Sequence, residues 1–133
     1  MDVSHLLDGL NAAQREAVSA PPGHYLVLAG AGSGKTRVLT HRIAWLHEVV
    51  GVPVHGIFAV TFTNKAAAEM RHRIEGQLRH GARGLWIGTF HGLAHRLLRL
   101  HWQDAKLPEG FQILDSDDQL RLVKRVVQQL EFD

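Results

Sequence analysis

The sequence contains no cysteine, and this absence excludes several kinds of protein. A disulfide scaffold, a thiol nucleophile and a cysteine-ligated zinc or iron–sulfur site all require that residue. No apolar stretch approaches the roughly 20 residues of a membrane-spanning helix, and Asp2 and Asp8 argue against a signal peptide at the start. We therefore expect a cytoplasmic protein with no membrane partner.

The composition is that of one soluble globular domain, with 45% hydrophobic and 21% charged residues in a chain of 133. The net charge is only +2, but the basic groups are concentrated in the middle of the chain. Residues 60–101 carry seven Lys or Arg against two Asp or Glu, whereas residues 102–133 carry four against seven. A local basic block favours contact with phosphate, and a solvated helix face is the alternative.

Three apolar runs, each followed by an amphipathic stretch, predict a repeated strand–helix unit. The strands are expected at 25–29, 57–62 and 85–89, and the helices at 35–50, 64–79 and 90–102. This pattern is typical of an α/β protein with a parallel sheet flanked by helices. The run 25–29 has no polar alternation, so we expect it to be a strand buried on both faces.

Helical periodicity predicts which residues of the helices are buried. For helix 35–50 they are Leu39, Ile43, Leu46 and Val50, and for helix 64–79 they are Ala67, Met70, Ile74 and Leu78. A short helix is expected at 10–19, with Asn11 as a possible cap. Residues 103–110 are expected to form a linker. Ser116 and Gln119 form a predicted capping box for a last helix that runs to the end of the chain, with Leu120, Val123, Val127 and Leu130 buried.

A phosphate-binding loop is predicted between the first strand and its helix. The residues are Ala29, Gly30, Ala31, Gly32, Ser33, Gly34, Lys35 and Thr36. Glycines allow the backbone N–H groups to turn toward a phosphate, and the start of the helix adds partial positive charge. Lys35 would reach the β- and γ-phosphates of ATP and Thr36 would ligate Mg²⁺, so both are candidate catalytic residues. Ala29 departs from the strict pattern, which has glycine there. The alternative is an ordinary glycine-rich turn.

Aromatic side chains follow two of the predicted strands, in Phe62-Thr63-Asn64 and in Thr89-Phe90-His91. Parallel strands present their carboxyl ends at one ligand-binding edge, and an aromatic ring there can stack on an unpaired base. The periodicity of apolar residues by itself favours a buried core position for Phe62. The pair His91 and His95 has the i, i+4 spacing of metal ligands, but no third ligand is evident, so a metal site is the weaker hypothesis.

Four ordered segments together resemble the N-terminal part of the UvrD/Rep-type superfamily 1A DNA helicases. They are residues 10–18, the phosphate loop, residues 60–70 and residues 88–94. The resemblance covers nearly the whole chain and implies a P-loop NTPase (RecA-like) sheet. Residues 1–102 would be the front of ATP-binding domain 1A, and residues 103–133 the start of an inserted helical subdomain 1B.

The resemblance also implies roles for individual residues. Gln14 would read the adenine edge of ATP, and Arg37 would pack against that base; a surface helical residue is the alternative for each. Phe62, Thr63, Asn64, Thr89, Phe90 and His91 would contact single-stranded DNA, which reverses the preference for Phe62 as core. The parent would be a bacterial 3′–5′ helicase acting on single-stranded and junction DNA, with repair proteins as partners and association with the nucleoid.

Hydrolysis requires a further carboxylate pair, which the family carries as Asp-Glu, and no Asp-Glu dipeptide occurs in the 133 residues. Asp115 follows an apolar run, but Ser116 and the residues after it indicate a helix cap instead. We therefore expect a truncated sheet that binds nucleotide weakly without turnover and self-associates through an exposed edge. A small-molecule P-loop kinase and a non-catalytic nucleotide-binding module remain alternatives.

Overall fold

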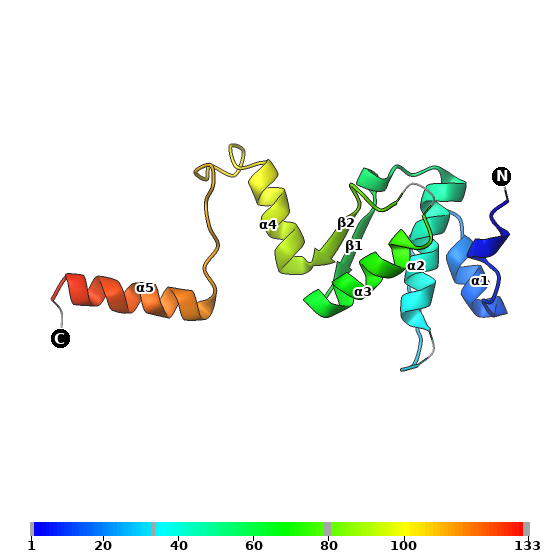
Figure 1. Cartoon of the computed structure of the whole chain (residues 1–133), viewed down its shortest axis with the longest axis horizontal. Coiled ribbons are helices and arrows are strands. Elements are labelled where there is room, and N and C mark those ends of the chain that lie inside the picture. The colour runs from blue at the N-terminus through cyan, green and yellow to red at the C-terminus, as the bar shows by residue number, and fades with distance from the viewer. Residues whose placement is uncertain (1, 33, 79–80, 132–133) are drawn as a thin grey trace. The chain divides into compact units, whose positions relative to one another are not determined.

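The structure, a computed structural model, describes residues 2–32, 34–78 and 81–131 (Figure 1). It divides into two compact units, Met1–Leu93 and Ala94–Asp133, which are described separately. Within the described residues no helix combines the length and the apolar character needed to cross a bilayer.

The first unit contains a small parallel sheet and the helices that pack around it. The short helical turns are Ser4–Leu6, Leu46–Val50 and Val54–Gly56, the helices are α1 (Ala12–Ser19), α2 (Lys35–Trp45) and α3 (Asn64–Glu75), and the strands are β1 (Phe58–Thr61) and β2 (Trp86–Thr89). Helix α4 (Phe90–Leu100) begins in this unit. The α/β class and the parallel pairing are therefore confirmed, although the described residues form a sheet of only two strands.

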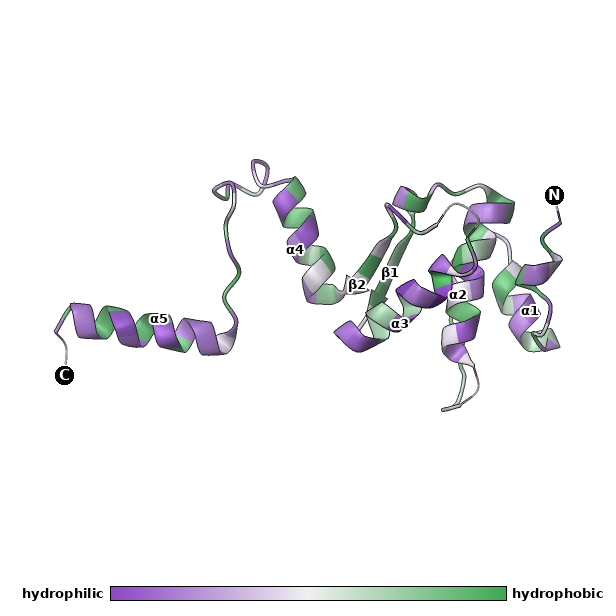
Figure 2. Cartoon of the chain, viewed as in Figure 1, coloured by the Kyte–Doolittle hydropathy of each residue, from purple (hydrophilic) through white to green (hydrophobic). Residues whose placement is uncertain are grey.

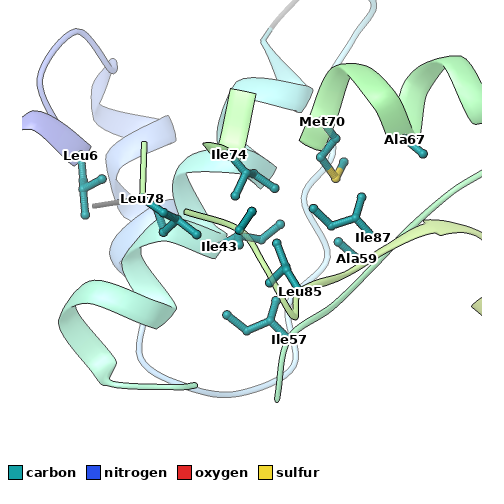
Figure 3. Packing of buried hydrophobic residues seen from close by; sticks show 12 residues of the cluster. Leu6, Ile43, Ile57, Ala59, Ala67, Met70, Ile74, Leu78, Leu85 and Ile87 are labelled. Atoms are coloured by element: carbon teal, nitrogen blue, oxygen red, sulfur yellow. The ribbon is translucent and has the colours of Figure 1, made fainter. Parts of the chain in front are cut away.

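Helix α3 packs against both strands of the sheet and contributes Ala67, Met70 and Ile74 to the main core (Figure 3). The predicted buried stripe is confirmed, since Ala67, Met70, Ile74 and Leu78 are all buried. They pack with Ile43, Ile57, Ala59, Leu85 and Ile87. The helix starts at Asn64 as predicted but ends at Glu75, so the prediction of helix at 76–78 is wrong; Arg79 lies outside the described residues.

The prediction of a buried strand at 25–29 is wrong for this structure. The segment is not a strand, and the side chains of Leu26 and Leu28 are 84% and 85% exposed. A strand is stabilised by hydrogen bonds to its neighbours, and in the described part of the chain the sheet consists of β1 and β2 alone. The apolar character of 25–29 is therefore present without the neighbours that would bury it.

Helix α2 begins at Lys35 as predicted and continues as a π-helical turn that ends at Gly51, whose φ of 87° terminates the helix. The predicted buried face of this helix is partly wrong. Ile43 is buried, but Leu39 is 51% exposed and Val50 is 40% exposed. The buried residues are Val38, Thr40, His41, Ile43 and Ala44, because α2 contacts both α1 and α3 and so buries two sides.

The second unit holds the rest of α4, hydrogen-bonded turns at 101–106 and helix α5 (Ser116–Gln129). The capping box predicted at Ser116 is wrong by one residue, because Asp115 is the N-cap and its carboxylate accepts a hydrogen bond from Asp118 N at 2.7 Å. The prediction that α5 runs to the end of the chain is also wrong, since α5 ends at Gln129.

Helix α5 has alternating apolar and polar residues (Figure 2), but its predicted burial is wrong. Leu120, Val123, Val127 and Leu130 are between 38% and 59% exposed. Amphipathic periodicity identifies the face of a helix that can be buried. No other element of the described residues covers that face.

His41 is a buried histidine of α2, with 9% of its surface exposed. Burial lowers its pKa, the Arg37 guanidinium and His5 add to this effect, and the Arg37 carbonyl, 2.7 Å from Nδ1, opposes it. With Nδ1 donating to that carbonyl, Nε2 is free to accept from the Gln77 amide at 3.4 Å.

We therefore predict that the folded chain loses stability as the pH falls below the ordinary histidine pKa of 6.5. The unfolded chain takes up a proton there before the folded chain does, so the loss grows until the pH passes the lower folded-state pKa. Chemical denaturation between pH 8 and pH 5 should show a smaller decrease for H41N than for the unmodified chain. The matched control is H55N, at an exposed histidine. Equal reductions in H41N and H55N would contradict the assignment.

Candidate nucleotide and DNA site

The predicted phosphate loop joins the segment 25–29 to the first turn of α2. Gly32 and Gly34 have φ of 75° and 80°, a backbone region that L-residues rarely occupy. Gly34 is the N-cap of α2, so Lys35 and Thr36 lie in its first turn, where the helix N–H groups are unpaired. A Cβ at Gly30 or Gly32 would meet no atom within 4 Å. Ser33 lies outside the described residues.

A cavity of about 320 Å³ lies beside this loop. Four of the predicted nucleotide-binding residues line it, namely Gln14, Ala29, Gly30 and Lys35. Asn11 and Val38 are also part of its wall. The volume falls within the range of small-ligand sites, and the lining combines an amide, a lysine and apolar surface, which suits the parts of a nucleotide.

Gln14 reaches the loop from α1, and its amide orientation is defined by a capping box. Its Oε1 accepts from Asn11 N at 3.0 Å, and its own N donates to Asn11 Oδ1 at 2.9 Å. The cap at Asn11 is thus confirmed. Gln14 Nε2 lies against Gly34, where a Cβ would approach it to 2.8 Å. The first helix and the phosphate loop therefore meet at this glutamine.

The other predicted nucleotide residues that the structure describes lie outside the cavity wall. Ala31 and Gly32 are exposed. The Arg37 guanidinium lies against Gly9, with Nη2 at 2.8 Å from the position of a Cβ there. Thr36 lines a separate cavity of about 340 Å³ together with residues 60–63 and Glu69. The P-loop threonine thus shares a cavity with the predicted DNA-contacting strand end.

The aromatic residues at the two strand ends are brought together. Strands β1 and β2 pair in parallel with Thr61 opposite Thr89, so both strands end at the same edge. The ring centroids of Phe62 and Phe90 are 5.6 Å apart, with 45° between the ring planes. Phe62 is 91% exposed and Phe90 57%, so the interpretation of Phe62 as plain core is wrong.

The polar residues beside these rings organise the following helices. Thr63 Oγ1 accepts from Ala66 N at 3.1 Å and Thr89 Oγ1 accepts from Gly92 N at 3.1 Å. Asn64 and His91 are exposed residues at the starts of α3 and α4. The hydroxyls are thus occupied as caps, while exposed polar groups and helix N–H groups remain beside the rings.

His95 is not placed as a metal ligand. Its Nε2 accepts from Arg99 Nε at 2.9 Å, and its ring centroid lies 5.6 Å from that of Phe111. Throughout the described residues, no three His, Asp or Glu side chains gather as a metal site would need.

Two arginines have roles that periodicity did not reveal. Arg71, which belongs to the basic block of residues 60–101, donates from Nη2 to the Ile87 carbonyl at 2.7 Å and so joins α3 to the end of β2. Arg42 on α2 donates to carbonyls at the end of α1. The sequence gives one indication of these contacts: each arginine is adjacent to a buried apolar residue, Arg71 to Met70 and Arg42 to Ile43.

Comparison with known proteins finds a family model, the UvrD/REP helicase N-terminal domain, that matches residues 10–133. DNA helicase II of Escherichia coli is 65% identical over 133 residues, which are 100% of this chain and 18% of that protein. The ATP-dependent DNA helicase PcrA of Bacillus subtilis is 48% identical over 130 residues, 98% of this chain and 18% of the relative. The ATP-dependent DNA helicase UvrD1 of Mycobacterium tuberculosis is 51% identical, over 96% of this chain and 17% of the relative. The chain thus spans under a fifth of the length of these relatives.

We predict that G34A destabilises the ligand-free chain by about 1 kcal/mol or more, because alanine is strained at this positive φ and its Cβ would displace the Gln14 amide. The comparison is with G32A, which has the same strain without the contact, and with G30A, which has neither. The order of unfolding free energies in urea should be G30A highest and G34A lowest. Equal values for G32A and G34A would contradict the contact with Gln14.

Proposed function

Because the chain belongs to the UvrD/Rep helicase family, we propose that it forms the ATP-binding front part of an ATP-dependent DNA helicase that moves along single-stranded DNA. The observation that carries the proposal is the pairing of two sites in one compact unit. The cavity with Gln14 and Lys35 suits a nucleotide, and the exposed rings of Phe62 and Phe90 suit unpaired bases.

In the nucleotide site, we propose that the amide of Gln14 selects adenine and that Arg37 packs on the base after moving from Gly9. The backbone from Ala29 to Gly34 would surround the β-phosphate, including Ala31 and Ser33. Lys35 would neutralise charge on the β- and γ-phosphates. The Thr36 hydroxyl would ligate the Mg²⁺ that accompanies ATP, and the ion would stabilise the developing phosphate charge.

In the DNA site, we propose that two neighbouring bases stack on Phe62 and Phe90, which requires no particular sequence. Asn64 and His91, together with the N–H groups at the starts of α3 and α4, would contact the phosphates between them. Thr63 and Thr89 would act by capping these helices as well as by their position beside the DNA.

The broader features of the proposal rest on the family resemblance. They are 3′–5′ polarity, action on junctions during mismatch and nucleotide-excision repair, repair-protein partners and association with the nucleoid in a bacterial cytoplasm. We place domain 1A at 1–102 and the start of subdomain 1B at 103–133, a boundary that keeps α4 whole. The exposed segment 25–29 supports self-association of the chain by strand pairing.

For the nucleotide site, we predict that the chain binds a fluorescent ATP analogue with Mg²⁺ and that K35A abolishes this binding. The lysine ammonium is the cation among the residues lining the cavity. The control is K124A, on exposed α5. Turnover should be absent, so hydrolysis at helicase rates would contradict the expectation for the chain alone. Failure of folded, unmodified chain to bind would contradict the site.

For the DNA site, we predict that F62A and F90A each weaken binding of single-stranded DNA roughly tenfold, the value of one lost base stack. Fluorescence anisotropy should show an unchanged salt dependence, because stacking releases no counterions. The matched control is F58A, which removes a phenylalanine that is also 57% exposed but lies at the opposite end of β1. An equal effect of F58A would contradict the proposed stacking of bases on Phe62 and Phe90. Salt-independent or absent DNA binding would favour a non-catalytic nucleotide-binding module.

A further inference from the structure

Arg42 joins three segments of the first unit although it lies away from the phosphate loop. It is seven positions beyond Lys35 on α2, so about 10 Å further along the helix axis. Its Nη1 donates to the carbonyls of Val18, at 2.9 Å, and of Ala20, and its Nη2 donates to that of Pro21 at 3.3 Å. The same guanidinium lies over the ring of Tyr25, 5.6 Å from its centroid.

Two of the three carbonyls that Arg42 binds, those of Val18 and Ala20, lie at the C-terminal end of α1. The last carbonyls of a helix have no partner within it and carry partial negative charge. Val18 lies in the last turn of α1, and Ala20 is its C-cap. A guanidinium offers several N–H donors in a fixed plane, so it can hold neighbouring carbonyls at once, which the point charge of a lysine ammonium cannot do equally well.

This contact determines where α1 lies relative to α2. Val18 also packs with Leu10 and Val38 in a small core between the two helices. Gln14 lies one helical turn before Val18, on the same face of α1, and its amide reaches Gly34 at the start of α2. Moving the end of α1 would therefore move the Gln14 amide relative to Gly34, which is held at the first turn of α2 as its N-cap.

We propose that Arg42 is a positioning residue that sets the preference of the site for adenine. It fixes α1 on α2, so that Gln14 meets the base while Lys35 meets the phosphates. The inference rests on the proposed nucleotide site. Arg42 is absent from the wall of the cavity that holds Gln14 and Lys35, so its effect on nucleotide binding is exerted through Gln14.

The test separates recognition of the base from recognition of the phosphates. Affinities for ATP, GTP and inorganic tripolyphosphate, each with Mg²⁺, are measured for the chain and for Q14A, R42K, R42Q and the double variant Q14A/R42K. R73K, at an exposed arginine of α3, is the control. R42K and R42Q should lower the ratio of ATP to GTP affinity roughly tenfold, about the value of one hydrogen bond, and leave tripolyphosphate affinity unchanged.

The double variant should have the same ATP to GTP ratio as Q14A alone, because residues that act through one contact are not additive. Additive losses would overturn the role of Arg42, and so would an unchanged ratio in R42K and R42Q. A parallel loss of tripolyphosphate affinity would show a general effect on folding and also overturn it. If the unmodified chain bound neither ATP nor tripolyphosphate, the nucleotide site itself would fail, and this role with it.

Discussion

The parallel pairing of β1 with β2 is the constraint on which the proposed DNA surface depends. Because Thr61 lies opposite Thr89, the two strands end at the same edge of the sheet. Each strand then leads into a helix whose first turn is capped by a threonine hydroxyl. A slip of one residue would turn one set of side chains to the other face of the sheet. Next to this edge, the Arg71 guanidinium donates to the Ile87 carbonyl and so holds α3 on the end of β2.

The proposed nucleotide site depends on the packing of helices more than on the sheet. Helix α1 brings Gln14, and α2 brings Lys35 and Thr36. Their contact is made by a small apolar core and by one arginine that binds the end of α1. The two proposed sites share the first compact unit, and Thr36 lines a cavity together with residues 60–63 at the end of β1.

Two apolar surfaces are exposed for a common physical reason. The segment 25–29 and the apolar face of α5 both have the residue pattern of buried elements, yet their side chains lie in solvent. Burial requires a second surface, and the described residues supply none at either place. The chain spans under a fifth of the length of its relatives.

The sequence by itself determined the local structure. Periodicity predicted the stripe of α3, the polar residue at Asn11 predicted the start of α1, and the glycines near Lys35 predicted a loop that leads into a helix. These features depend on neighbours in the chain, through helix geometry, capping and backbone sterics. The motif order was sufficient to identify the family that the comparison then showed.

Only the tertiary structure decided which surfaces meet. It left 25–29 unpaired and α5 uncovered, placed Phe62 beside Phe90, and gave Arg42 and Arg71 carbonyl partners 24 and 16 positions away in the chain. The sequence shows which side chains are apolar enough to be buried and which are charged and able to form hydrogen bonds. Whether such a side chain is in fact buried or hydrogen-bonded depends on a partner, and the position of that partner is set by the packing of distant segments.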